Sequence, residues 1–441
     1  MSINRLTDLL IYWVGLVWLV IATAPVQATP IIDHWVTTNG LRVYFVAAHE
    51  LPIVDVRVVF AAGSSRDGEH PGLASFTNGL LDQGAGGLSA DEIAEKAAQL
   101  GARLATEALR DMAIVQLRSL ADPATLTPAL DLARAVLVHP DFPDIAIERE
   151  RARTLTALEE QQQSPASLAE QAFYLAIYGD HPYGHNLLGS GDTLTTITRE
   201  DLLVFHQRYY TARNGIVAIV GDLDRPGAEA LVQRLTADLP PGEAAPLLPS
   251  PAPLAQATRV DVSFPVAQTH LLIGQPALRR LDPDFYALYL GNHILGGGSL
   301  VSRIATQVRE ERGLSYSASS YVLPMAVEGP FTISLQTRND RAGEASQVAQ
   351  RTLEEFITAG PTSQELEEAK QHLTGGFALR IDSNRKIVEY LAVIGFYQLP
   401  LDYLDSFREQ INALTQEQVR DACQRHIHPD RLVTVAVGGG H

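Results

Sequence analysis

Histidines are the residues of this sequence best suited to metal chemistry, but their spacing forms no recognisable metal site. The chain has 13 histidines, and none is followed by Glu three residues later. His181 and His185 are four residues apart, as two ligands on one helical face would be. Pro182 and Gly184 lie between them and argue against a helix. A structured loop is therefore the favoured interpretation of this pair.

The other candidate ligands form no recognisable metal site either. His426 and His428 could chelate a metal weakly, but Pro429 follows them at the end of a predicted helix. In the internal repeat described below, their places are taken by Tyr209 and Thr211, which favours a structural role. The single cysteine of the chain excludes an intramolecular disulfide, a zinc site of paired cysteines and a thiol redox couple.

Composition narrows the class of protein further. Of the 441 residues, 46% are hydrophobic and 19% are charged, which predicts a folded chain and excludes wholesale disorder. The 34 basic and 51 acidic residues give a formal net charge of −17. No segment is rich enough in Lys and Arg to indicate a nucleic-acid-binding face.

The N-terminal segment has the pattern of a targeting signal. Residues 9–22 form an apolar run of 14, and 26–28 (VQA) offer a small-x-small cleavage site. This pattern predicts a secretory signal peptide over 1–28 and a periplasmic mature protein. The alternative is an uncleaved membrane anchor facing the periplasm, although the run is shorter than the ~20 residues of a typical span.

The mature chain contains an internal duplication. Residues 198–221 and 415–438 match at an offset of 217: each has Thr before a helical stretch, Gln-Arg at the same place and a β-branched run closed by Gly. The repeated order of elements predicts two copies of one fold. A charged helix and then an apolar one also recur upstream, at 144–161 and 164–182 in the first half and at 362–374 and 383–400 in the second.

Each half opens with strand-like sequence and continues with helices. This order indicates an α+β fold in which each duplicated domain is a mostly antiparallel sheet with helices packed on one face. The predicted strands are 41–47 and 54–61 in the first half and 259–264 and 269–273 in the second, and the first predicted helices are 72–83 and 284–295.

A proline-rich segment separates the two halves. Residues 239–258 contain six prolines, which lack the backbone donor of a β-ladder and stiffen the chain. We therefore predict a linker there, between an N-terminal domain at 29–238 and a C-terminal domain at 259–441.

Two sequence blocks connect these features to a known family. One starts with HPYG at 181–184 and ends with Gly-Asp at 221–222, and the other joins LGGG at 295–298 to REERGLSYS at 309–317. Over essentially the whole mature chain, the sequence resembles the pitrilysin/insulinase family of zinc peptidases, and most of all its short, processing-peptidase-like bacterial members. The resemblance implies two α+β domains that form half of a clamshell.

The resemblance also implies that the zinc site of the family is lost. Active members carry the inverted motif His-x-x-Glu-His on the first helix, with a further Glu ligand downstream. Here Ser75 and Gly79 stand at the histidine positions and Asn78 at that of the catalytic Glu. The downstream ligand position falls near Thr156 and Ala157. These residues cannot hold Zn²⁺ or act as a general base, so we expect no metal bound by this chain.

A pair in the second domain survives from the catalytic apparatus of the family. Arg309 and Tyr316 lie on a helix that Gly313 would end and on the strand-like segment after it. From spacing alone they would be a surface arginine and a packed tyrosine. In the family the corresponding pair faces the zinc, which implies that both side chains donate to the substrate carbonyl as it becomes an oxyanion.

A glycine triplet precedes that helix. The simplest interpretation of Gly296, Gly297 and Gly298 is a flexible turn. Their partial resemblance to the glycine-rich loop of non-catalytic processing-peptidase subunits implies a contact with substrate instead.

Loss of the zinc motif with retention of the Arg/Tyr pair implies a division of labour between two chains. We expect the non-catalytic subunit of an exported heterodimeric zinc metallopeptidase, inactive alone, whose zinc-motif-bearing paralogous partner holds the zinc. Unfolded peptides would bind in extended form at a sheet edge. Two alternatives stay open: a peptide-binding pseudoenzyme acting alone or as a homodimer, and a structural subunit of an envelope assembly. A third alternative, an autonomous metallopeptidase, would be supported if the purified chain bound zinc.

Overall fold

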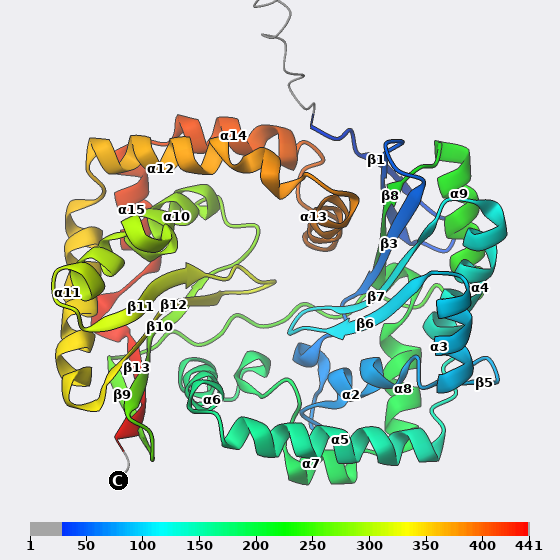
Figure 1. Cartoon of the computed structure of the whole chain (residues 1–441), viewed down its shortest axis with the longest axis horizontal. Coiled ribbons are helices and arrows are strands. Elements are labelled where there is room, and N and C mark those ends of the chain that lie inside the picture. Colours follow the sequence, from blue (N-terminus) through cyan, green and yellow to red (C-terminus); the bar gives the residue numbers. More distant parts are fainter. Residues whose placement is uncertain (1–28, 440–441) are drawn as a thin grey trace, which may run out of the picture. The chain divides into compact units, whose positions relative to one another are not determined.

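The computed structural model describes residues 29–439, so the predicted signal peptide at 1–28 lies outside the described residues. In the described part of the chain, no helix is long and apolar enough to cross a membrane. Two large β-sheets with helices packed around them make up the compact unit that begins at Ile32 (Figure 1). The predicted α+β class is confirmed.

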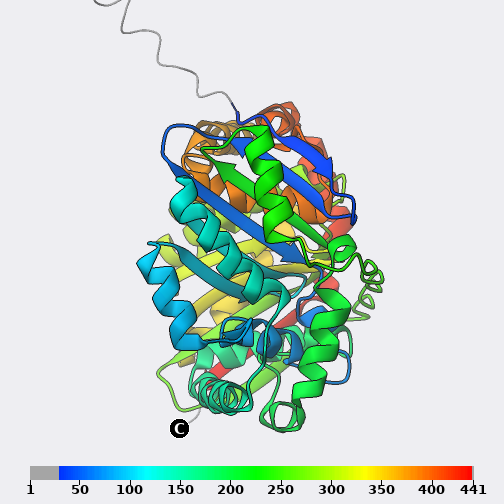
Figure 2. The same ribbon diagram turned by 90° about the vertical axis from the view of Figure 1, so that its right-hand side faces the viewer.

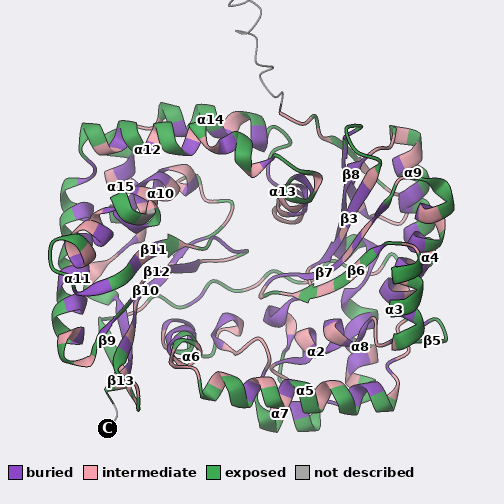
Figure 3. Ribbon diagram, viewed as in Figure 1, coloured by how far each residue is buried: buried purple, intermediate pink, exposed green. Residues whose placement is uncertain are grey.

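The first sheet has six strands in the order β1-β2-β8-β3-β7-β6. Neighbours are antiparallel, except that β2 and β8 are parallel. Every residue of β8 is buried (Figure 3), as expected for a β-branched run inside a sheet with both faces covered. The strands are β1 Asp33–Val36, β2 Arg42–Ala47, β3 Ile53–Phe60, β6 Arg103–Ala108, β7 Ala113–Leu120 and β8 Gly215–Gly221, and a separate two-stranded ribbon joins β4 Gly84–Ala85 to β5 Leu88–Ser89.

The second sheet repeats the topology of the first. Its five strands have the order β11-β12-β10-β13-β9, and β13 and β9 are its parallel pair. Starting from β2 and from β9, the two sheets read β2-β8-β3-β7-β6 and β9-β13-β10-β12-β11, so the duplication predicted from the sequence extends to strand order. The strands are β9 Thr258–Phe264, β10 Gln268–Leu278, β11 Ser315–Val322, β12 Gly329–Arg338 and β13 Val433–Gly439.

Helices from each half pack on the outer face of its own sheet, and Figure 2 shows α4 and α9 in front of the first sheet. Thr198 and Thr415 cap the two repeated helices, α8 and α15, by accepting the backbone N–H of Asp201 and Gln418. The helices of the first half are α2 Leu73–Leu80, α3 Ala90–Gln99, α4 Pro123–Val138, α5 Asp144–Gln162, α6 Pro165–Tyr178, α7 Gly191–Thr196, α8 Arg199–Tyr209 and α9 Arg225–Leu235; those of the second are α10 Phe285–Asn292, α11 Ala342–Ala359, α12 Ser363–Gly375, α13 Asn384–Tyr397, α14 Tyr403–Ala413 and α15 Gln416–His426.

One helix of each half covers the remaining face of the other sheet, which the sequence did not reveal. α6 contacts β10 and β13, and α13 contacts β3 and β8 (Figure 1). Phe173 and Ile177 of α6 share a hydrophobic cluster with Val433 and Val435 of β13. These two apolar helices thus join the halves by burying hydrophobic area of both sheets.

The proline-rich segment forms no helix or strand between residues 239 and 257. Its start is tied to the first half, because the backbone N–H groups of Ala212 and Arg213 donate to the carbonyl oxygens of Pro240 and Pro241 at 2.8 and 3.0 Å. The domain limits at 238 and 259 stay a prediction.

Candidate functional site

A cavity of about 520 Å³ lies beside α2, the helix that carries the degenerate zinc motif. Ser75, Asn78 and Gly79 line this cavity from α2, and Glu150 lines it from α5. The structure therefore brings three of the four degenerate positions to one concave site. The fourth, Ala157, is on α5 but is not one of the described residues that line the cavity.

Asn78 is held inside the fold by an amide-specific network. Its side chain is 1% exposed, and its Nδ2 donates to the Tyr210 hydroxyl at 3.2 Å and to the Ile114 carbonyl oxygen at 3.4 Å. An amide can donate to both acceptors but cannot take a proton from water. The position that the resemblance assigns to the general base is thus occupied by a buried, hydrogen-bonded amide.

Gly79 leaves open space beside a carboxylate that sequence reasoning missed. A Cβ atom built on Gly79 would meet Glu150 Oε1 at 3.5 Å, an ordinary van der Waals distance. The Glu150 side chain is 15% exposed and has Arg153 at 3.5 Å, and burial raises the pKa of its carboxyl. Its one sequence signal was its place seven residues before Ala157, which puts both on one face of α5.

The residues at the motif positions do not fit a zinc ion. A hydroxyl, an amide and a glycine supply neither imidazole nor carboxylate. The same cavity is also lined by His185 and by the carboxylates of Asp82, Glu107, Glu150 and Glu170, but no three of these described side chains bring their ligand atoms within metal distance of one another. Within the described residues, one group of three His, Cys, Asp or Glu side chains has its ligand atoms close enough for a metal. That group, Asp282, Asp284 and His426, belongs to the second half.

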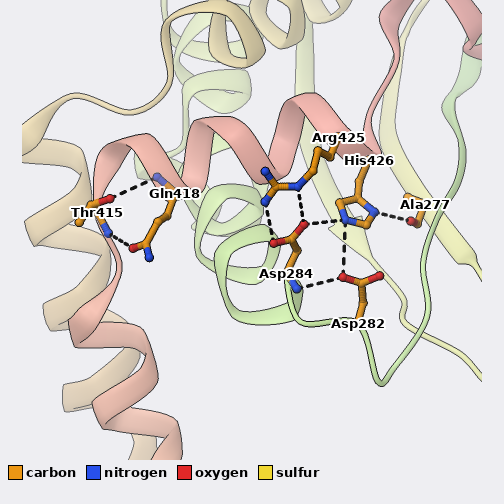
Figure 4. Close-up of polar contacts among 7 residues, drawn as sticks. All are labelled: Ala277, Asp282, Asp284, Thr415, Gln418, Arg425 and His426. Carbon is orange, nitrogen blue, oxygen red and sulfur yellow. Dashed lines mark hydrogen bonds and ion pairs between the residues drawn. The ribbon is translucent and has the colours of Figure 1, made fainter.

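Ion pairs already occupy the carboxylate of Asp284 in this group (Figure 4). Arg425 donates to both oxygens of Asp284 at 2.8 Å, and His426 Nε2 lies 2.9 Å from Asp284 Oδ2. His426 Nδ1 lies 3.1 Å from the carbonyl oxygen of Ala277. These contacts join α15 to the start of α10, which agrees with the structural role predicted for His426.

His181 and His185 also have the loop geometry that the sequence indicated. Between them, Pro182–Gly184 form a 3₁₀ turn, and His181 Nδ1 accepts the backbone N–H of Tyr183 at 3.1 Å. His181 Nε2 lies 2.9 Å from the carbonyl oxygen of Pro249 in the proline-rich segment. His181 therefore supports the path of the chain, whereas His185 lines the cavity beside α2.

Arg309 and Tyr316 lie next to each other at an edge of the second sheet. Arg309 is in the π-helical turn Ala305–Glu310, and Tyr316 is on β11, the edge strand. The guanidinium carbon of Arg309 is 5.1 Å from the centre of the Tyr316 ring, within cation–π distance. Gly313 between them has a φ of +57°, the left-handed conformation predicted for the helix end.

Tyr316 is not a packed tyrosine. It is 88% exposed, and no hydrogen bond of its hydroxyl to another described residue is found. The hydroxyl is therefore free to reach a group outside the fold. This observation removes the main argument for a purely structural role of the pair.

Comparison with known proteins identifies the family of the chain. A family model for insulinase, peptidase family M16, matches residues 42–191, and one for the peptidase M16 inactive domain matches 196–373. A crystal structure of a peptidase M16 inactive domain from Pseudomonas fluorescens is 40% identical, with a TM-score of 0.90 over 93% of this chain and 98% of that one. The chain belongs to the M16 peptidase family. The resemblance found in the sequence is confirmed.

More distant proteins are also similar over most of the chain. YmxG, an uncharacterized zinc protease of Bacillus subtilis, is 24% identical over 414 residues, 93% of this chain and 99% of that protein. The periplasmic protease PqqL of Escherichia coli has a TM-score of 0.76 at 18% identity, over 93% of this chain and 46% of PqqL. Identities this low establish the fold alone.

The glycine triplet of this M16 chain contains two kinds of position. Gly296 is buried, and a Cβ there would lie 2.4 Å from the backbone nitrogen of Ser320 on β11. Gly297 is exposed, and its Cβ would meet the side-chain nitrogen of Asn292 at 2.9 Å and the Asn292 carbonyl oxygen at 3.2 Å. Gly298 is half-buried, with the carbonyl oxygen of His293 at 2.8 Å from its Cβ position. Gly296 has a packing role, and a contact of the triplet with substrate stays a prediction.

Alanine substitutions at these positions should differ in their effect on the free energy of unfolding. Gly296→Ala is expected to lower the free energy of unfolding by roughly 1–3 kcal/mol, because backbone must shift to admit the methyl group. Gly297→Ala should change it less, since this position is exposed and its closest approach to backbone is 3.2 Å, to the Asn292 carbonyl oxygen, against 2.4 Å at Gly296. Urea unfolding of both variants checks this, and equal losses would contradict it.

The start of α2 lies over a buried carboxylate. Asp67 is 3% exposed, and its oxygens accept the backbone N–H groups of Gly72 and Ala74 at 2.8 and 2.7 Å. Burial outweighs these two hydrogen bonds and raises the pKa of Asp67 to about 7. The helix that carries the degenerate motif is therefore anchored by a group that titrates near neutral pH.

This anchor predicts a pH-dependent stability. Between the ordinary Asp pKa of 3.8 and about 7, the native state binds a proton that the unfolded state does not. The stabilisation is complete below 3.8 and is lost as the pH rises through 7, with a slope of at most about 1.4 kcal/mol per pH unit. Urea unfolding at several pH values should show this slope flattened in Asp67→Asn. Equal slopes in both proteins would be evidence against it.

Proposed function

We propose that this chain is the non-catalytic subunit of a heterodimeric M16 zinc metallopeptidase. The observation that carries the proposal is a combination of two sites. The cavity beside α2 has Ser75, Asn78 and Gly79 where zinc ligands and a base belong, whereas Arg309 and Tyr316 are adjacent and Tyr316 is exposed. This combination would contribute to catalysis in a complex whose other subunit carries the intact motif and the zinc.

The role proposed for Arg309 and Tyr316 is oxyanion stabilisation in that partner's site. A guanidinium and a phenolic hydroxyl can both donate to a peptide carbonyl oxygen, and both strengthen as negative charge develops on it. The ring of Tyr316 lies 5.1 Å from the guanidinium carbon of Arg309, so the two groups can approach one oxygen together. Fixed donors of this kind contribute about 2.7–4 kcal/mol each to the transition state, a factor of about 100 to 1,000 in rate.

The proposed binding place for an extended peptide is the edge of the first sheet. β6 is the edge strand of the first sheet and pairs only with β7 in the described structure, so its outer backbone groups can accept another strand. Residues 106–108 at the end of β6 line the cavity beside α2. An unfolded peptide added to β6 would therefore run past Ser75 and Gly79.

Export is part of the same proposal. The sequence of residues 1–28 supports it, and the shared fold with the periplasmic protease PqqL is compatible with it. The mature protein would then meet its partner and its peptides in the periplasm.

The second candidate is a peptide-binding protein that acts without a zinc-bearing partner. It is favoured by one observation, that the β6 edge and its cavity are complete within this chain. Cleavage of an unfolded peptide by the mature chain (residues 29–441), by the zinc-motif paralogue and by their mixture decides between the two. The main proposal expects cleavage to need the mixture. A paralogue that is fully active alone would favour the second candidate.

A further inference from the structure

A buried carboxylate lies where the two halves of the fold meet. Asp111, in the turn between β6 and β7, is 5% exposed. Its Oδ1 accepts the Tyr183 hydroxyl at 2.5 Å, and its Oδ2 accepts the Tyr397 hydroxyl and the backbone N–H of Ala326, both at 2.8 Å. Arg66 interacts with it electrostatically, but within the described residues Asp111 forms no ion pair.

The partners of Asp111 come from both halves. Tyr183 is in the first half, whereas Tyr397 ends α13 and Ala326 lies between β11 and β12. The two residues after Ala326 are bonded to the first half as well, so residues 326–328 are held along their whole length. The Ala326 N–H donates to Asp111, the Val327 N–H donates to the Tyr183 hydroxyl at 3.4 Å, and the Tyr178 hydroxyl donates to the Glu328 carbonyl oxygen at 3.0 Å.

These bonds connect two parts of the candidate site. Arg110, the neighbour of Asp111, lines the cavity and donates to the Tyr183 carbonyl oxygen at 3.2 Å. Segment 326–328 follows β11, the strand that carries Tyr316. A displacement of this segment would therefore move β11 relative to the cavity.

The chemistry of the junction leaves Asp111 hard to replace. All three partners donate, and a carboxylate is acceptor-only. Burial, and after it the charge of Asp111, raises the pKa of both Tyr183 and Tyr397, so both hydroxyls stay protonated donors. In Asp111→Asn one of the two carboxylate oxygens becomes an NH₂ group, so a donor would face either Tyr183 or the pair Tyr397 and Ala326 in place of an acceptor.

We propose that Asp111 is a positioning residue that fixes the second half, with Arg309 and Tyr316, in one orientation relative to the cavity. The fixed orientation follows from the contacts alone. Its consequence for peptide cleavage rests on the proposed function, so the two are tested separately.

Distance measurement between spin labels tests the orientation. Labels at Ala230→Cys on α9 and Glu355→Cys on α11 lie on exposed positions of different halves, and the native Cys423 is 2% exposed and escapes labelling. The expected result is one narrow distance distribution in the otherwise unchanged chain and a clearly broader one in Asp111→Asn. An equally narrow distribution in Asp111→Asn would overturn the proposal.

Two further variants keep this experiment decisive. Tyr397→Phe removes one hydroxyl and should broaden the distribution less than Asp111→Asn does, which provides a test if Asp111→Asn folds poorly. Asp284→Asn breaks a carboxylate network within the second half and should lower the Tm while the distribution stays narrow. If Asp284→Asn broadened the distance distribution as much as Asp111→Asn does, the effect of Asp111→Asn would be explained by a general loss of stability, and no positioning role would remain.

Kinetics of the mixed complex test the consequence for cleavage. Asp111→Asn should lower kcat by about tenfold to a hundredfold with KM little changed, because the peptide still binds while its carbonyl meets displaced donors. Asp284→Asn should change neither constant. An unchanged kcat together with a broadened distribution would overturn the positioning role. Failure of the proposed function would look different, since Arg309→Ala would then also be without effect.

Discussion

Arg309→Ala and Tyr316→Phe are each expected to lower kcat of the mixed complex by about 100-fold, with KM little changed. The loss should fall on kcat because the two donors interact more strongly with the oxyanion of the transition state than with the carbonyl of the bound peptide. Neither change should affect folding, since Tyr316 is 88% exposed and Arg309 makes its described contact with that ring. Steady-state cleavage of an unfolded peptide measures both constants.

Matched controls lie in the same segment. Tyr321→Phe changes a tyrosine on the same strand, β11, and Arg312→Ala removes an arginine three residues after Arg309 that bonds to Gln307 and Glu311. Both controls should keep the wild-type kcat. Wild-type rates in Arg309→Ala and Tyr316→Phe as well would remove the catalytic role of the pair and leave the peptide-binding alternative.

Restoring two histidines should create a zinc site where the family has one. Ser75 and Gly79 are four residues apart on α2, both line the cavity, and Gly79 has room for a side chain next to Glu150. The double variant Ser75→His, Gly79→His is therefore expected to bind Zn²⁺ through two imidazoles and the Glu150 carboxylate. A dissociation constant of about 1 µM, or about 8 kcal/mol of binding free energy, is the expected scale.

Calorimetric titration with zinc checks this expectation, with the wild-type chain as the reference that should bind none at this site. Adding Glu150→Gln to the double variant should weaken binding strongly. Peptide cleavage should stay absent from the zinc-loaded double variant, because Asn78 cannot act as a base. No zinc binding by the double variant would contradict the geometry assigned to Ser75, Gly79 and Glu150.

Local patterns in the sequence were enough to predict the fold class, and the resemblance to the family added the degenerate motif. The β-branched runs that became β8 and β13, and the Thr caps of α8 and α15, are short-range features, so their repetition predicted two copies of one fold. The place of Ser75, Asn78 and Gly79 on one helix follows from helical periodicity. These features depend only on residues that lie close together in the sequence.

The parts that sequence reasoning missed depend on contacts between distant residues. Asp111 and Tyr397 are 286 residues apart in sequence and bond at 2.8 Å. The packing of α6 and α13 on the sheet of the other half likewise leaves no mark beyond apolar composition. Glu150 is one of many acidic residues on a charged helix, and only its distance from Gly79 distinguishes it.

The most direct test of the central claim is a titration of the zinc-motif paralogue with the mature chain, followed by peptide cleavage. If this chain supplies Arg309 and Tyr316 in trans, activity should rise with added chain and level off at one chain per paralogue. The same titration with the Arg309→Ala, Tyr316→Phe double variant should reach the same stoichiometry at a far lower rate. A paralogue that reaches its full rate without the chain would contradict the account.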